Sequence, residues 1–154
     1  MPEPLQWGVF TVRPATAQDA SIIAGHRSPE LGQDHPALPQ YAAWVGDALT
    51  RGVYLGWLAE RQGAVVGGAG LTLLEWGPTR DDPSPVRARV VNVFTAPEWR
   101  RQGVARALLE EALRAAQARG IRTLSLGTTE QARPLYQGLG FQASPHEMLR
   151  RAGR

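Results

Sequence analysis

Apolar side chains recur every three to four residues in several stretches of the chain, a spacing typical of helices that bury one face. The pattern and its flanking stop signals predict helices over residues 16–26, 41–51 and 103–119, and a short one near residues 132–138. The strongest apolar face belongs to residues 103–119 and comprises Val104, Leu108, Leu109, Ala112, Leu113 and Ala116. Thr16 and Asp19 have the spacing of a capping box and open the first helix.

Stretches rich in β-branched and aromatic residues alternate with turn formers and predict strands. They are residues 9–13, 53–60, 64–76, 87–95 and 121–127, with the last strands beginning at Phe141. The turn Arg61-Gln62-Gly63 separates two of them and predicts an antiparallel hairpin. The order of elements predicts an α/β (α+β) fold, a mixed sheet with helices on its faces, in one domain of residues 1–154.

Composition narrows the class of protein. The chain has 154 residues, 43% of them hydrophobic and 20% charged, as expected of one globular domain with a genuine core. It has no apolar run near ~20 residues, so we expect no membrane span. Residues 1–8 lack the basic and apolar regions of a secretory signal, and cysteine is absent, which excludes disulfides and thiolate metal sites. These features favour a cytoplasmic location.

All 17 basic residues are arginine, and the formal net charge is only +3. Because the arginines are spread along the chain, the sequence does not predict nucleic-acid binding. The absence of lysine excludes a phosphate-binding loop of the GxxxxGK[ST] type. The three histidines, His26, His35 and His146, lack metal-ligand spacing, so we expect no metal. The run Gly67-Gly68-Ala69-Gly70 lacks GxGxxG spacing and is interpreted as strand glycines that allow close approach.

A basic turn leads directly into the strongest predicted helix and reads Arg100-Arg101-Gln102-Gly103-Val104-Ala105. The first N–H groups of a helix have no acceptor within the helix, and the helix dipole places partial positive charge there. Glycine lets the backbone approach an anion closely, and the arginines add charge-assisted hydrogen bonds. The segment therefore predicts a phosphate or pyrophosphate site. A solvated basic turn before a surface helix is the alternative.

Two motifs resemble those of the GNAT acyltransferase superfamily. Arg100, Gly103 and Ala105 match its pyrophosphate-binding signature [R/Q]-x-x-G-x-[G/A], and the stretch NVFTAPE precedes them. The stretch LYQGLGF at residues 135–141 resembles the second signature of that family. The resemblance covers residues 10–149, and the combined motifs resemble a bacterial subgroup of uncharacterised or small-molecule acetyltransferases. It implies the GNAT fold: a mixed, mostly antiparallel twisted sheet with helices on both faces and splayed central strands.

The resemblance also implies where acetyl-CoA binds. Its pantetheine arm would enter a cleft between the strands at residues 90–95 and 123–127 and pair with the strand backbone. A backbone N–H near Phe94 would stabilise the oxyanion, and Tyr136 would serve as general acid toward the departing thiolate. The residues implied to bind the coenzyme are Val93, Phe94, Thr95, Arg100, Arg101, Gln102, Gly103, Val104, Ala105, Arg106 and Tyr136. Thr129 stands where many members have asparagine.

The catalytic base is the open question at this point. Many members place a carboxylate on the strand before the first signature, but this chain has Asn92 there. Glu75 is the candidate base, with His146, Glu147 and an ordered water as alternatives. The resemblance implies an N-acetyltransferase in which a primary amine, of a small molecule, attacks acetyl-CoA directly. The alternative is a non-catalytic acyl-CoA-binding or regulatory domain. Dimers are frequent in the family, so the resemblance is compatible with a homodimer, and the sequence leaves the oligomeric state open.

Overall fold

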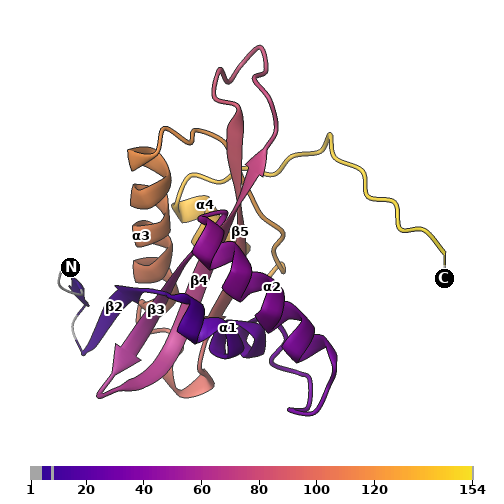
Figure 1. The fold of residues 1–154 in the computed structure, drawn as a ribbon. Coiled ribbons are helices and arrows are strands. Elements are labelled where there is room, and N and C mark those ends of the chain that lie inside the picture. The colour runs from indigo at the N-terminus through magenta and orange to yellow at the C-terminus, as the bar shows by residue number, and fades with distance from the viewer. Residues whose placement is uncertain (1–4, 8, 154) are drawn as a thin grey trace.

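The chain forms one twisted sheet between two layers of helices, as seen in a computed structural model that describes residues 5–7 and 9–153 (Figure 1). The elements are β1 (Leu5–Trp7), β2 (Phe10–Pro14), η1 (Ala17–Asp19), α1 (Ala20–Arg27), α2 (Ala37–Arg51), β3 (Tyr54–Arg61), β4 (Ala64–Glu75), β5 (Val86–Thr95), η2 (Pro97–Trp99), α3 (Val104–Ala118), β6 (Leu124–Ser125) and α4 (Arg133–Gly138). The six strands lie in sequence order; every pair is antiparallel except β5–β6, which is parallel. The predicted mixed, mostly antiparallel sheet is confirmed.

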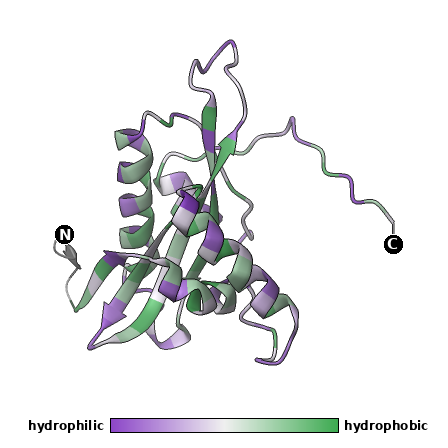
Figure 2. Cartoon of the chain, viewed as in Figure 1, coloured by the Kyte–Doolittle hydropathy of each residue, from purple (hydrophilic) through white to green (hydrophobic). Residues whose placement is uncertain are grey.

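Two apolar cores hold the layers together, one on each face of the sheet. Helices α3 and α4 pack on one face against Leu71 and Val90, and α1 and α2 pack on the other around Tyr54. In Figure 2, purple and green bands alternate along α3, as expected of a helix with one buried face. Five of the six predicted stripe residues of α3 are buried, and Leu113 is half-buried.

The observed helices and strands differ most from the predicted ones in four places. Helix α2 begins at Ala37, four residues before the predicted start at residue 41, because proline is tolerated in the first helical turn and Pro39 occupies it. Strand β1 (Leu5–Trp7) was not predicted. The expectation that residues 1–8 hold no secretory signal falls mostly outside the described residues, since only Leu5–Trp7 of them are described. Strand β6 has two residues instead of the predicted 121–127.

The fourth difference lies at the C-terminal end. The prediction of strands beginning at Phe141 is wrong, since none of the described residues from 141 to 153 is in a strand. This segment, residues 142–153, is exposed, and Figure 1 shows it in yellow running away from the sheet. It contains few β formers, which is the physical reason that it adds no strand. Within the described part of the chain, no helix has the length and apolar character needed to cross a bilayer.

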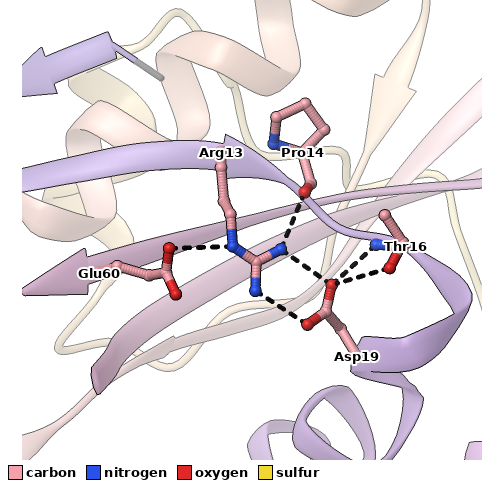
Figure 3. Close-up of polar contacts among 5 residues, drawn as sticks. All are labelled: Arg13, Pro14, Thr16, Asp19 and Glu60. Atoms are coloured by element: carbon pink, nitrogen blue, oxygen red, sulfur yellow. Dashed lines mark hydrogen bonds and ion pairs between the residues drawn. The ribbon is translucent and has the colours of Figure 1, made fainter. Parts of the chain in front are cut away.

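A network of ionic hydrogen bonds fixes the entry into α1 (Figure 3). The guanidinium of Arg13 donates to both carboxylate oxygens of Asp19 at 2.9 Å and to Glu60 at 3.0 Å. Asp19 also accepts the backbone N–H of Thr16 at 2.8 Å, which is half of the predicted capping box. The hydrogen bonds from Arg13 are the main reason that the pKa of Asp19 lies below its ordinary value. The network ties β2 to the first helical layer.

Replacing Asp19 with asparagine is expected to lower the free energy of unfolding by about 2 kcal/mol, because a mostly buried charged acceptor is lost. A carboxylate with a lowered pKa contributes its full stability above the unfolded value, and the contribution disappears as the pH falls through the folded value. Urea unfolding at pH 7 and below pH 4 measures this. The difference between wild type and Asp19→Asn should shrink at the lower pH. The exposed Asp47→Asn change, which breaks the surface pair with Arg51, is the control. Equal effects of the two variants at pH 7 would contradict the prediction.

Candidate active site

The two central strands separate and open a cleft. Strands β5 and β6 pair only at Ala88–Leu124 and Arg89–Ser125. Beyond this point a cleft of about 580 Å³ lies between residues 89–93 of β5 and residues 126–129, which follow β6. The end of α1 and Tyr136 of α4 also line it. The splayed central strands implied by the family resemblance are therefore present.

A β-bulge in β5 accounts for the separation. Gly68 of β4 pairs with Phe94, but Gly70 pairs with Val91, so β5 holds one extra residue at Asn92 and Val93. Asn92 has a left-handed backbone, with φ of 58°, a conformation that asparagine tolerates better than most residues. A bulge bends its strand and redirects its side chains. It lies three residues after the last β5–β6 pair, at Arg89, and β6 does not continue alongside it.

The bulge directs the side chain of Asn92 toward α1 and α2, where three elements hold it. Its amide nitrogen donates to the hydroxyls of Tyr41 at 2.8 Å and Tyr54 at 2.9 Å. Arg27 donates to its amide oxygen at 3.1 Å and lies over the ring of Tyr41, 4.4 Å from the centroid. Since a guanidinium can only donate, the oxygen must face Arg27 and the nitrogen the tyrosines. Burial raises the pKa of Tyr54, which keeps its hydroxyl protonated.

Three glycines of β4 make room for the side chains around the cleft. A Cβ added at Gly67 would lie 2.8 Å from Val104 of α3, and one at Gly68 would lie 2.7 Å from His26. A Cβ at Gly70 would lie 1.9 Å from the hydroxyl oxygen of Tyr54. The interpretation of this run as strand glycines that allow close approach is confirmed.

His26 lies in the cleft, which its sequence position alone did not indicate. Its ring stacks on Phe94 of β5, with centroids 4.5 Å apart and planes at 15°. Burial lowers the pKa of His26 to about 4, so the imidazole is neutral at physiological pH. It presents an uncharged polar group beside the bulge.

Tyr136 lies where the cleft meets a second cavity of about 330 Å³. Its side chain is only 8% exposed, and burial raises the pKa of its hydroxyl. The hydroxyl forms no hydrogen bond with any other residue in the described ranges. A protonated donor is therefore available to a bound molecule. Pro134 occupies the first turn of α4, where proline is tolerated, and Thr129 accepts the N–H of Ala132 at 3.2 Å just before it.

The basic turn precedes α3 as the sequence predicts. Arg101 and Gly103 both have left-handed backbones, with φ of 63° and 82°, and Gly103 is the N-cap of α3. No side chain of the described residues caps this end, which leaves the first N–H groups of the helix directed at solvent or a ligand. Arg100, Arg101, Gln102 and Arg106 are exposed, Ala105 is half-buried and Val104 is buried. A Cβ at Gly138 would lie 3.6 Å from Arg106, so α4 lies beside this turn.

The strand edge expected to receive the pantetheine arm is open. Strand β5 pairs with β4 as far as Thr95, whereas its other edge has no partner strand beyond Arg89 in the described part of the chain. Val93, Phe94 and Thr95 are half-buried along this stretch. An extended molecule can add to such an edge through backbone hydrogen bonds.

The candidate base Glu75 is not brought to this site. It ends β4 opposite Val86, six residues from Asn92 along β5, which is roughly 20 Å. Side-chain alternation also places it on the α3 face with Leu71 and Leu73, and it lines neither cavity. Glu147 lines the smaller cavity, and His146 is exposed beside it.

The comparisons with known proteins agree with this geometry. The sequence profile described as "Acetyltransferase (GNAT) domain" matches residues 53–143, more than half of the chain. The chain belongs to the GNAT acetyltransferase family. The matched GNAT region contains the hairpin, the bulged strand, the basic turn and α4, and therefore all the elements that line the cleft except α1.

Two solved structures share the GNAT fold over nearly the whole chain. A GCN5-related N-acetyltransferase from Ralstonia eutropha is 30% identical, with 94% of this chain and 99% of that chain covered and a TM-score of 0.82. A protein from Clostridium acetobutylicum, described as a predicted acetyltransferase and solved with acetyl-CoA, is 20% identical, with 92% and 96% covered and a TM-score of 0.84.

A curated relative adds a sequence match over part of the GNAT region. The mycothiol acetyltransferase of Thermobifida fusca is 35% identical over 89 residues, which are 58% of this chain and 25% of that protein. The chain spans about a quarter of the length of the curated relatives it matches, 22% and 25%.

Proposed function

We propose that the chain is an acetyl-CoA-dependent N-acetyltransferase that acts on a primary amine of a small molecule. The observation that carries this proposal is the open edge of β5 in the same cleft as the unpartnered hydroxyl of Tyr136. The family supports acetyl transfer, and the related structure solved with acetyl-CoA supports the choice of co-substrate.

The open strand edge and the basic turn fit the two parts of acetyl-CoA. The backbone of Val93, Phe94 and Thr95 would pair with the pantetheine arm along the open strand edge. The N–H groups of residues 101–106, aided by the arginines at 100, 101 and 106, would bind the pyrophosphate. When bound, the thioester supplies an acetyl group that an amine can take over directly.

Two groups of this chain would then assist the transfer. The N–H near Phe94 would donate to the carbonyl oxygen as negative charge develops there. The hydroxyl of Tyr136 would donate to the departing sulfur. We place no side-chain carboxylate as base, since none belongs to the described residues that line the cleft, and neutral His26 with a pKa of about 4 is a weak proton acceptor. The ammonium would lose its proton to bulk solvent before the attack, so that the free amine reacts with the thioester.

The proposed function is tested by measuring both the binding of acetyl-CoA and the transfer of its acetyl group to amines. Acetyl-CoA at a hundred times its dissociation constant should stabilise the protein by about 2.7 kcal/mol, measured as a rise in Tm. Release of free thiol with a panel of amines then measures transfer. Stabilisation without thiol release for any amine would favour the alternative, a non-catalytic acyl-CoA-binding domain. Absence of stabilisation would contradict both.

Replacing Gly103 with alanine is expected to weaken acetyl-CoA binding about tenfold, because φ of 82° is strained for any residue with a Cβ and the turn would shift. Isothermal titration with acetyl-CoA measures the change. Gly120→Ala, at the other end of α3 and also left-handed, is the control that matches the strain but lies away from the turn. If both variants bind acetyl-CoA as well as wild type, the pyrophosphate does not lie at Gly103.

A cytoplasmic location and a homodimer stay predictions.

A further inference from the structure

The charged side chains that line the main cleft are all basic. Arg27 comes from the end of α1 and Arg89 from β5, and the cleft lining contains no aspartate or glutamate among the described residues. Arg89 of β5 is paired with Thr72 of β4, and Thr72 is paired with Tyr54 of β3. Because directly paired residues share one face of a sheet, the side chain of Arg89 lies on the α1/α2 face, as that of Tyr54 does. A molecule that enters the cleft from this face meets both guanidinium groups, on the side of the sheet opposite α3.

Neutral groups hold both arginines in place. Arg27 donates to the amide oxygen of Asn92 and lies over the ring of Tyr41. Arg89 donates to the hydroxyl oxygen of Ser125 at 3.2 Å. None of these partners carries a charge that would compensate the guanidinium. Each guanidinium has five N–H donors, so both retain donors for a ligand.

Five arginines of the described residues are paired with carboxylates. The ion pairs in the described residues join Arg13, Arg51, Arg106, Arg114 and Arg133 to aspartate or glutamate. Neither Arg27 nor Arg89 has such a partner in the described part of the chain. The cleft therefore carries uncompensated positive charge next to the bulge at which the acceptor amine would react.

We infer that the acceptor is an amine that also carries a carboxylate or phosphate group, and that Arg27 and Arg89 bind this anionic group. The inference rests on the proposed function, of which it specifies the substrate class. Guanidinium groups match the geometry of both anions and form strong charge-assisted hydrogen bonds with them. A polyamine would instead bring further positive charge into a cleft that has no acid to receive it.

Matched pairs of amines test the inference. L-phenylalanine and phenethylamine differ by a carboxylate, and O-phosphoethanolamine and ethanolamine differ by a phosphate; spermidine represents polycations. Thiol release from acetyl-CoA gives kcat/KM for each. Calorimetric titration of the same compounds into protein saturated with CoA gives binding without transfer. The anionic member of at least one pair should be favoured tenfold or more, and the pair with the larger ratio identifies the anion.

Substitutions assign the effect to the arginines. Arg89→Gln should lower kcat/KM for the anionic amine at least tenfold, leave its neutral counterpart within about twofold and leave the KM for acetyl-CoA unchanged. Arg89→Lys should recover part of the loss. Arg27→Gln is the second variant, and Arg51→Gln on α2, outside the cleft, is the control.

Three results would overturn the inference: preference for neutral amines or spermidine, no loss in either variant, or a rise in the KM for acetyl-CoA, which would show that the arginines bind the coenzyme. Absence of thiol release with every amine would contradict the proposed function instead. Calorimetry would then decide the inference: anion binding lost in Arg89→Gln supports it, and no anion binding contradicts it.

Discussion

Tyr136→Phe is expected to lower kcat about a hundredfold while leaving the dissociation constant of acetyl-CoA within about twofold. The hydroxyl has no hydrogen-bond partner in the described ranges and lies at the junction of the two cavities, so its removal breaks no hydrogen bond of the folded chain. The ring of residue 136 keeps its edge-to-face contact with Phe141, in which the ring centroids are 6.0 Å apart. Stability should therefore be unchanged, and the loss should concern the transfer step alone.

The role of the hydroxyl follows from the pKa values of tyrosine and of the departing thiol. Tyrosine has an ordinary pKa of about 10 and a thiol about 8.5, and burial raises the pKa of Tyr136 further. Full proton transfer to the departing sulfur is therefore uphill, and the hydroxyl acts mainly as a hydrogen-bond donor to developing charge. Single-turnover thiol release measures the transfer step, and titration with acetyl-CoA measures binding. A kcat equal to that of wild type would remove Tyr136 from the proposed mechanism.

The parts of the site that the sequence predicted are those built from local motifs. The basic turn, Gly103 and the helix after it lie within one short segment, and so does Tyr136 before its LGF triplet. Local spacing is enough to place such residues on a turn or a helix. The hairpin at Gln62 and Gly63 was equally local, because its left-handed residues, with φ of 52° and 80°, suit a two-residue turn.

The parts that the sequence did not predict depend on register and on contacts between distant elements. Glu75 was the candidate base because it ends a strand near the expected cleft, but strand pairing fixes it at the far end of β5. The side chains around Asn92 come from α1, α2 and β3, up to 65 residues away in sequence. No spacing rule links them, and the bulge that brings Asn92 to them shifts the register by one residue.

Asn92 therefore has a structural role where many family members are expected to have a carboxylate. Its uncharged side-chain amide donates hydrogen bonds to two tyrosine hydroxyls and accepts one from an arginine. A carboxylate at this position would face two tyrosine hydroxyls and Arg27 and would neutralise that arginine. The substitution by asparagine thus leaves the cleft positive, which connects the missing base with the anionic acceptor inferred above.

Gly70→Ala is expected to lower the free energy of unfolding by about 3 kcal/mol and to reduce acetyl transfer severely. The added Cβ would lie 1.9 Å from the hydroxyl oxygen of Tyr54 and 2.4 Å from its ring carbon Cζ. Tyr54 is 1% exposed and cannot swing into solvent without opening the α1/α2 core. Its displacement would remove one of the hydrogen bonds that hold Asn92 at the bulge.

Urea unfolding measures the loss of stability, and the side-chain amide resonances of Asn92 in an NMR spectrum report its environment. Gly25→Ala is the matched control, since it lies within α1 with nothing within 4 Å of the added Cβ and should be neutral or slightly stabilising. Adding Tyr54→Phe to Gly70→Ala removes the closest atom but leaves Cζ, so stability should return only in part. If Gly70→Ala is as stable and active as Gly25→Ala, Tyr54 does not occupy the space above Gly70, and the network that positions Asn92 would have to be built differently.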